Sequence, residues 1–559
     1  MITVIEHPVM SQAPSSMEKT DWSRRYAELS EMMLRVRRLC PRLPVLGMAT
    51  LRATHFLSSD QVQLMEELEH LERRQASTRR VRAPALTRLI WRWLRCVVFA
   101  CRDTFSLGYL QLRFNRDLKR LMRQPARVIM RTWNFSPPPP DESTDFYYGS
   151  LPQQVEARGV SYLLLCGDGL SKLDAAFTRA VLNRERLRGV PEHLLVPIWA
   201  PIVMSCRQLT AALALRRLAI RAADDRFAAV CRAASLGSLQ TITQRNALNF
   251  YSARRAVKTW RAKAFVTLYE GQPWEHPAWH GAKAADPDCL TVGFQHTVLL
   301  AHNFSLLRSQ DNGQRSSQPD VVLCSGPRTK VVMREGHQRS RLVTFGTYRP
   351  FPEHGTSHRP SPARRTVLVV PESGFIREAK ILFNFAMSAA RSVPDHRFIF
   401  RCHPMMPFGS LRHHLRWAPE MFPNIELSEA SFAEDCGRSS VILYRGSSSV
   451  LYAVMYGLKP VYLHDERHQH GDPLFELTLW RERVTSGAEL EWTLRRYAAT
   501  KDGVLDEWRA AADYVRRYAI PVSGAAVDGF LAAVNLATAP SVAGTASRVH
   551  AFAGHEAVG

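Results

Sequence analysis

Two loop sequences combine residue types that bind anions. Arg401-Cys402-His403-Pro404 follows the short apolar run Phe398–Phe400, and Arg445-Gly446-Ser447-Ser448-Ser449 follows Val441–Tyr444. Guanidinium groups, and the free N–H groups of a Gly-Ser turn before a helix, are suited to a phosphate. Ligands of an open parallel sheet bind outside the carboxyl ends of its strands. We therefore predict a nucleotide-phosphate site formed by Arg401, His403, Arg445, Gly446, Ser447, Ser448 and Ser449.

A second group of residues could take a proton from an attacking hydroxyl. Glu270, Glu275 and His296 each come soon after a predicted strand, and group transfer to a hydroxyl needs a general base. Glu270 directly follows the apolar run Ala264–Tyr269, where partial burial would raise its pKa and suit it to proton transfer. A loop or helix-capping role is the alternative for Glu270, and His296 could equally bind the donor or the acceptor. All three stay candidates for the catalytic residue.

The phosphate-binding group supplies cations and N–H groups, so it could stabilise a leaving phosphate without a metal ion. Histidines and acids gather between His464 and Asp472 in a composition that resembles a metal cluster: His464, Asp465, Glu466, His468, His470 and Asp472. Their spacing is not that of a structural zinc site, so a solvated loop is the preferred interpretation. We expect neither a metal nor a cofactor, with any nucleotide-sugar donor acting as a substrate.

The elements that must position these groups alternate between strand and helix. Apolar runs of strand length alternate with helical patterns on both sides of a Pro-, Ser- and Arg-rich segment, which predicts parallel sheets covered by helices on both faces. The predicted strands include Ala264–Tyr269, Val321–Cys324 and Val367–Val370. Long helices are expected at Arg207–Ala234 and Leu490–Tyr518. The predicted fold is α/β, with two Rossmann-like doubly wound domains facing a cleft and a helical N-terminal extension. Its segments are a basic helical extension (1–123), an N-terminal acceptor domain (124–353), a linker (354–365), a C-terminal nucleotide-binding domain with closing helices (366–536) and a mobile tail (537–559).

Length and charge limit the alternatives. A chain of 559 residues is too long for one core, and its 46% hydrophobic content is that of a globular protein. The net charge of +23 favours anionic partners such as nucleotide sugars, anionic lipid surfaces or nucleic acid. No nucleic-acid-binding module is recognisable, so nucleic acid is disfavoured. The ten cysteines contain no Cys-x-x-Cys pair, and no apolar run reaches the roughly 20 residues of a membrane span, so a reducing, cytoplasmic location is expected.

One basic segment near the N-terminus has two interpretations. Leu89–Cys101 is the most apolar patch of the N-terminal part and is interrupted by Arg92 and Arg95. Such a helix could lie on the anionic inner face of the cytoplasmic membrane. It could equally be a basic helix packed against its own protein.

The order of the motifs resembles a known group of enzymes. Arg401-Cys402-His403-Pro404, then Gly446-Ser447-Ser448-Ser449 and Lys459-Pro460-Val461, is similar to GT-B glycosyltransferases of bacterial surface and capsular polysaccharide synthesis. The similarity is narrowest to capsule Kdo transferases, polysialyltransferases and CDP-glycerol glycerophosphotransferases. Tyr269-Glu270, Trp274-Glu275 and Gly293-Phe294-Gln295-His296 resemble motifs of surface carbohydrate biosynthesis proteins. The resemblance implies that His403, Ser447 and Ser448 contact a cytidine nucleotide.

Together these observations predict a metal-independent, inverting glycosyltransferase. Its donor would be a nucleotide-activated sugar, CMP- or CDP-linked by the resemblance, and its acceptor a glycan or glycolipid of a surface polysaccharide pathway. The alternative is a non-catalytic, basic peripheral membrane or scaffold protein of polysaccharide assembly that keeps a degenerate GT-B fold.

Overall fold

The computed structural model describes residues 84–134, 136–168, 173–301, 304–307, 317–349, 359–372, 376–403, 406–465, 471–500 and 504–536, together with Glu28, Glu31, Met32, Arg35 and Val36. The predicted mobile tail, 537–559, and residues 354–358 of the predicted linker lie outside these residues. None of the helices in the described part is long and apolar enough to cross a bilayer.

The first lobe is built on a sheet of seven parallel strands in the order β3-β2-β1-β4-β5-β6-β7. The strands are β1 (Val128–Asn134), β2 (Tyr162–Asp168), β3 (Gly189–Pro191), β4 (Ala264–Tyr269), β5 (Leu290–Gln295), β6 (Val321–Cys324) and β7 (Arg341–Thr344). Every residue of β4 and β6 is buried. Strands covered on both faces read as continuous apolar runs, which is why the sequence predicts these two without error.

The second lobe has a sheet of six parallel strands in the order β10-β9-β8-β11-β12-β13. They are β8 (Thr366–Pro371), β9 (Arg397–Phe400), β10 (Ile425–Leu427), β11 (Val441–Arg445), β12 (Lys459–Leu463) and β13 (Glu482–Val484). Both sheets are therefore doubly wound and Rossmann-like, as the sequence predicts. The order of strands reverses beside β1 and β4 in the first sheet and beside β8 and β11 in the second. These two switch points are where such sheets bind ligands.

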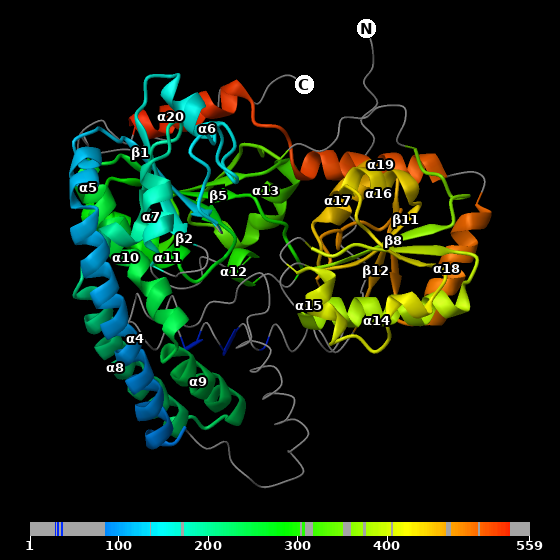
Figure 1. Cartoon of the computed structure of the whole chain (residues 1–559), viewed down its shortest axis with the longest axis horizontal. Helices are drawn as coiled ribbons and strands as arrows, with labels where there is room; N and C mark the ends of the chain where they lie inside the picture. The colour runs from blue at the N-terminus through cyan, green and yellow to red at the C-terminus, as the bar shows by residue number, and fades with distance from the viewer. Residues whose placement is uncertain are drawn as a thin grey trace.

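Helices cover both faces of the first sheet (Figure 1). They are α4 (Leu86–Arg113), α5 (Asn115–Met122), α6 (Leu151–Glu156), α7 (Ala175–Leu182), η1 (Glu192–Leu195), α8 (Ala200–Arg221), α9 (Asp225–Ser238), α10 (Thr241–Trp260), α11 (Glu275–Ala285), α12 (Phe304–Leu307), α13 (Pro327–Met333) and η4 (Glu335–His337). The single helix predicted at Arg207–Ala234 is wrong, because the chain leaves the helix after Arg221. Asp224 then caps a new one by accepting a hydrogen bond from the amide of Arg226 at 3.0 Å.

The helices of the second half of the chain are α14 (Ile376–Ser392), α15 (Phe408–Arg412), η5 (Pro419–Met421), α16 (Phe432–Arg438), α17 (Ser449–Met455), α18 (Gly487–Ala499), α19 (Val504–Tyr518) and α20 (Gly524–Leu536). The predicted helical region Leu490–Tyr518 is two helices, α18 and α19. α19 ends at the first lobe, where the amide of Ile520 donates to the carbonyl of Ser325 at 2.9 Å and the amide of Thr347 donates to the carbonyl of Ile520 at 2.7 Å.

After this crossing, α20 packs on the first lobe (Figure 1). Its side chains Val527, Phe530 and Leu531 join the core of the first sheet. Segment 366–536, which the sequence assigns to the second domain, thus contributes to both cores. The crossing is tight, since a Cβ on Gly326 would stand 2.5 Å from the carbonyl oxygen of Tyr518.

Helix α4 runs along the outer edge of the first lobe, on the side remote from the second sheet (Figure 1). Its inner side packs on α8, with Leu89, Cys96 and Leu107 almost fully buried. The indole N–H of Trp93 donates to the carbonyl of Ser205 at 3.1 Å. Part of the predicted patch Leu89–Cys101 is therefore core, while the other side of the helix faces outward.

Candidate functional site

Two of the three candidate bases lie together at the carboxyl ends of β4 and β5, next to the switch point of the first sheet. Glu270 follows β4 and His296 follows the neighbouring β5. The Nε2 atom of His296 lies 2.8 Å from the Oε1 atom of Glu270, and the two side chains are 7% and 17% exposed. The other carboxylate oxygen of Glu270 accepts a hydrogen bond from the side chain of Gln272 at 3.2 Å. A carboxylate that holds an imidazole is the arrangement found in many acid–base sites.

The third candidate, Glu275, has a different environment. It begins α11 and is fully buried. Its two oxygens accept hydrogen bonds from the amides of Glu270, at 2.8 Å, and Gly271, at 3.1 Å. Gly271 has a φ of +79°, which suits a glycine in this turn. These contacts make Glu275 the residue that fixes the turn and orients Glu270, so a role as the base does not fit its position.

An aromatic side chain from the loop after β1 borders the pair. The ring of Tyr147 lies 4.9 Å from the ring of His296. Burial and the charge of Glu270 raise the pKa of the Tyr147 phenol well above its ordinary value. Buried Asp145 holds this loop, because its carboxylate accepts hydrogen bonds from the amides of Tyr147 and Tyr148, both at 2.9 Å, and from the hydroxyl of Thr132. The loop therefore positions Tyr147 rigidly beside the imidazole.

Arg349 lies beside Tyr147, in the segment that follows β7, the last strand of the first sheet in chain order. Its guanidinium carbon is 4.3 Å from the ring centre of Phe146 and 5.5 Å from that of Tyr147. The charge of Arg349 opposes the burial that raises the pKa of Tyr147, and it does the same for Tyr452 of α17 in the second lobe. One guanidinium thus acts on Tyr147, which borders His296, and on Tyr452 of the helix that follows the predicted phosphate loop.

Arg445, predicted to bind phosphate, is buried instead. Its side chain is 2% exposed; its Nε atom is paired with the carboxylate of Glu378 on α14, and one terminal nitrogen donates to the carbonyl of Leu463 at 3.1 Å. Direct phosphate binding by Arg445 does not fit these contacts. The arginine instead ties α14 and β12 to the strand that carries the loop.

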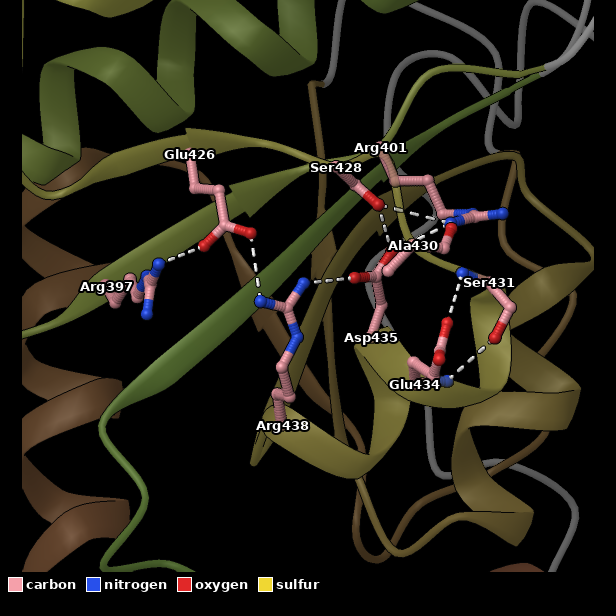
Figure 2. Close-up of polar contacts among 9 residues, drawn as sticks. All are labelled: Arg397, Arg401, Glu426, Ser428, Ala430, Ser431, Glu434, Asp435 and Arg438. Carbon is pink, nitrogen blue, oxygen red and sulfur yellow. Dashed lines mark hydrogen bonds and ion pairs between the residues drawn. The ribbon is translucent and has the colours of Figure 1, made fainter.

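Arg401 is partly occupied in the same way (Figure 2). One terminal nitrogen donates to the carbonyl of Ala430 at 2.6 Å, to the hydroxyl of Ser428 at 3.2 Å and to the buried carboxylate of Asp435 at 2.8 Å. Asp435 also pairs with Arg438 at 2.7 Å. Figure 2 shows the other terminal nitrogen of Arg401 pointing away from Asp435. The network thus fixes the loop after β9 and leaves one edge of the guanidinium directed elsewhere.

The loop after β11 has a backbone that only glycine fits well. Gly446 has a φ of +72°, and a Cβ there would stand 2.4 Å from a carboxyl oxygen of Glu372. Glu372 directly follows the neighbouring strand β8 at the switch point and is 9% exposed. Burial and then the charge of Glu378 raise its pKa well above the ordinary value, with Arg445 opposing. A protonated carboxyl would be a hydrogen-bond donor next to the loop.

The remaining predicted ligands lie on the same edge of the second sheet. Ser447, Ser448 and Ser449 lead into α17, and the amide of Ser449 donates to the hydroxyl of Ser447 at 3.3 Å. His403 follows β9 and is half-buried, and this burial lowers its pKa. The loops after β8, β9 and β11 thus share one edge, as parallel strands require.

Among the described residues, no three histidine, cysteine or acidic side chains lie close enough together to hold a metal ion. Residues 466–470 of the His464–Asp472 cluster lie outside the described part. Asp472 is not solvated, as the loop interpretation implied, but buried, and it accepts a hydrogen bond from the phenol of Tyr444 at 2.6 Å. The sequence also has an Asp-x-Asp pair, Asp286 and Asp288, but it precedes β5 and so lies at the opposite edge of the sheet.

Several residues of this region carry no sequence motif. Tyr147 and Asp145 lie in a loop after a proline run, and Arg349 stands where the chain leaves β7 for the linker. Of these residues, only Glu372 could have been identified from the sequence, because it comes directly after the predicted strand Val367–Val370 and Pro371, where ligand-binding loops begin.

Neither a protein-family model nor a curated protein matches the sequence. Among solved structures, the glycotransferase of kitacinnamycin is 14% identical over 73% of this chain and 99% of that one, with a TM-score of 0.41. The glycosyltransferase SnogD from Streptomyces nogalater is 15% identical over 74% and 100%, with a TM-score of 0.38. A putative UDP-N-acetylglucosamine 2-epimerase from Listeria monocytogenes is 10% identical over 74% and 96%, with a TM-score of 0.40. These similarities concern the fold and carry no argument about activity.

Proposed function

We propose that this protein is a metal-independent glycosyltransferase that moves a sugar from a nucleotide-activated donor to a hydroxyl of an acceptor. The observation that supports this most is the contact between Glu270 and His296 at the carboxyl ends of β4 and β5, next to the switch point of the first sheet. A second set of polar loops lies at the switch point of the other sheet. Two ligand sites of this kind suit two substrates, with the acceptor at the first and the donor at the second.

The chemistry assigned to the pair is general base catalysis. The acceptor oxygen attacks the anomeric carbon, the bond from that carbon to the phosphate oxygen breaks, and the nucleotide leaves with the bonding electrons. The proton of the acceptor hydroxyl passes to the imidazole of His296, and the carboxylate of Glu270 stabilises the imidazolium that forms. Attack from the side opposite the leaving nucleotide inverts the anomeric centre.

The leaving phosphate needs positive charge and N–H groups around it. With Arg445 buried against Glu378, the groups proposed for this task are the Gly446–Ser449 loop, the half-buried His403 and the outward edge of Arg401. Arg349 is added because its charge acts on residues of both lobes. A guanidinium binds phosphate oxygens through two parallel hydrogen bonds, so it would suit the diphosphate or monophosphate of the donor.

The identity of the substrates is a finer part of the proposal. The resemblance of the Arg401–Pro404 and Gly446–Ser449 motifs favours a CMP- or CDP-linked sugar and an acceptor of surface polysaccharide or glycolipid synthesis in the cytoplasm. Binding of nucleotides tests this directly. A ligand at a hundredfold excess over its Kd adds about 2.7 kcal/mol to the stability of the folded state.

The experiment is a thermal-shift screen of the full chain with CMP, CDP, UDP, GDP and ADP. We expect one nucleotide to raise the melting temperature, and His403→Ala and Ser447→Ala/Ser448→Ala to remove that rise while the melting temperature without ligand changes little. An exposed serine outside the site, such as Ser410, serves as the matched alanine control. A large loss of stability in His403→Ala with an intact response to nucleotide would make His403 a core residue and overturn its place in the site.

The second candidate, a non-catalytic scaffold with a degenerate fold, is favoured by one observation only, the exposed apolar face of α4 described below. The two candidate functions differ in whether the protein turns over a donor sugar. Hydrolysis of the donor sugar without acceptor, lost in Glu270→Gln, supports the enzyme; nucleotide binding with no turnover of any donor supports the scaffold.

A further inference from the structure

Helix α4 presents a second apolar face that nothing in the described part of the chain covers. Large apolar side chains recur along its outer side at helical spacing with high exposure: Leu86 47%, Ile90 42%, Trp91 65%, Leu94 44%, Val98 68%, Phe105 78%, Tyr109 54% and Leu112 80%. At 100° per residue these positions fall within a single arc of about 140°. A contiguous exposed patch of this kind marks an interaction surface.

The outer face is separate from the packing of the helix on its own protein. Leu89, Cys96, Ala100, Leu107 and Leu110 are all at most 2% exposed and occupy the opposite side. The helix is therefore held in place without the outer residues. Their size and hydrophobicity have no role in the core of this lobe.

Charge is distributed along one border of the same face. Arg88, Arg95, Arg102 and Arg113 are exposed, and they lie beside the arc at 160–200° when Leu86 is set at about 0°. The one acidic residue of the helix, Asp103, is 3% exposed. An apolar face with a cationic border and no exposed carboxylate is the pattern of helices that lie in the interface of an anionic bilayer.

We propose that the outer face of α4 lies on an anionic lipid surface, with the apolar arc among the acyl chains near the headgroups and the arginines on lipid phosphates. A helix of 28 residues is roughly 40 Å long, so the contact is extended. Charge favours lipid over a second copy of the chain, because the face carries arginines and the helix has no exposed carboxylate that could pair with them across a dimer. The inference does not depend on the proposed function.

The test is co-sedimentation of the full chain with vesicles of phosphatidylglycerol and phosphatidylcholine, compared with phosphatidylcholine alone. We expect binding to the anionic vesicles only. Phe105→Ser/Leu112→Ser should weaken it by about tenfold or more, since each of these side chains loses its burial in lipid. Arg88→Gln/Arg95→Gln should weaken it by about 25-fold, at about fivefold for each charge.

Matched controls come from exposed apolar residues elsewhere. Met421→Ser/Trp492→Ser replaces side chains that are 64% and 59% exposed, and should leave sedimentation unchanged. All of these variants alter surface residues, so equal melting temperatures verify folding. High salt should reduce binding by screening the arginines without abolishing it.

Three results would overturn the proposal. Equal sedimentation of Phe105→Ser/Leu112→Ser and the parent protein would remove α4 from the contact. A dimer in light scattering that the same variant dissociates would assign the face to a second copy. Vesicle binding that is lost on deletion of residues 1–83, with α4 intact, would assign the contact to that segment of the chain.

Discussion

His296 Nε2 and Glu270 Oε1 lie 2.8 Å apart although each residue belongs to the loop after a different strand. The contact exists because β4 and β5 are parallel neighbours, with Tyr269 in register with Gln295. Residues that directly follow paired positions of neighbouring strands emerge side by side. The two side chains are in direct contact, so their contributions to turnover should not be independent.

Replacement of either member of the pair should reduce turnover far more than nucleotide affinity. We expect Glu270→Gln and His296→Asn each to lower the rate by about 10², the usual contribution of a positioned base. The double variant should lose little more than the worse single variant, because the residues act as a unit. Donor hydrolysis and transfer rates measure this, with thermal shift reporting nucleotide binding. Additive losses would show that the two act separately.

Glu275→Gln should behave differently from Glu270→Gln. Its carboxylate accepts two backbone hydrogen bonds in a fully buried turn, so the amide, which can accept at only one end, should lower the melting temperature and disturb Glu270 indirectly. We expect a loss of about 1–3 kcal/mol of stability. Urea unfolding checks it, and a variant with unchanged stability but no turnover would return Glu275 to the catalytic group.

We expect Arg349 to contribute to binding of the nucleotide donor and not to the stability of the fold. Arg349→Gln is expected to lower nucleotide affinity or turnover by about tenfold or more, the worth of one charge-assisted hydrogen bond. Arg349→Lys should recover part of the charge but not the paired geometry. Arg509→Gln, on the exposed side of α19, is the matched control. Full activity of Arg349→Gln would leave the cation–π contacts with Phe146 and Tyr147 as its whole role.

Gly446→Ala should disrupt the loop after β11. An L-residue in the left-handed region costs about 1–2 kcal/mol, and the added Cβ would also press on Glu372. We expect lower stability and loss of the thermal response to nucleotide. Gly437→Ala is the control, since its Cβ meets no atom within 4 Å. Retention of the response in Gly446→Ala would separate this loop from the nucleotide site.

Glu372 predicts a dependence of stability on pH. Its pKa is raised in the folded protein, so between the unfolded and folded values the native state holds the extra proton. Stability therefore falls as pH rises through that range, because the unfolded state ionises more readily. Glu372→Gln cannot ionise and should lose less stability than the parent protein over the same pH range. Parallel pH profiles of the two proteins, from urea unfolding at several pH values, would contradict the shift.

The sequence correctly predicts those strands whose residues form a clear local pattern. Ala264–Tyr269 and Val321–Cys324 are apolar runs, and their bounds as strands are correct. β10 and β13 have three residues each, which is too short for a pattern to stand out. The strands place the loops correctly at the sheet edges, so the Glu270–His296 neighbourhood follows from their parallel order.

The direction of a side chain depends on partners far away in the sequence, and here the predictions fail. Arg445 is predicted to face a phosphate, but its side chain is buried in an ion pair with Glu378 of α14. Arg401 is held partly by Asp435, whose position opposite β9 no local pattern reveals. Arg349 follows a short, half-exposed strand and precedes a linker, so neither periodicity nor a motif singles it out.

The path of the chain at Ile520 has a consequence for how the protein could be divided. Because α20 carries Val527, Phe530 and Leu531 back into the first core, the two lobes are joined by chain at two places. A polypeptide cut once between β7 and β8 would still be tethered through the second place. Two fragments produced separately, one ending after β7 and one beginning before β8, should therefore associate. The packing of α20 on the first core and the backbone hydrogen bonds of Ile520 would hold them together.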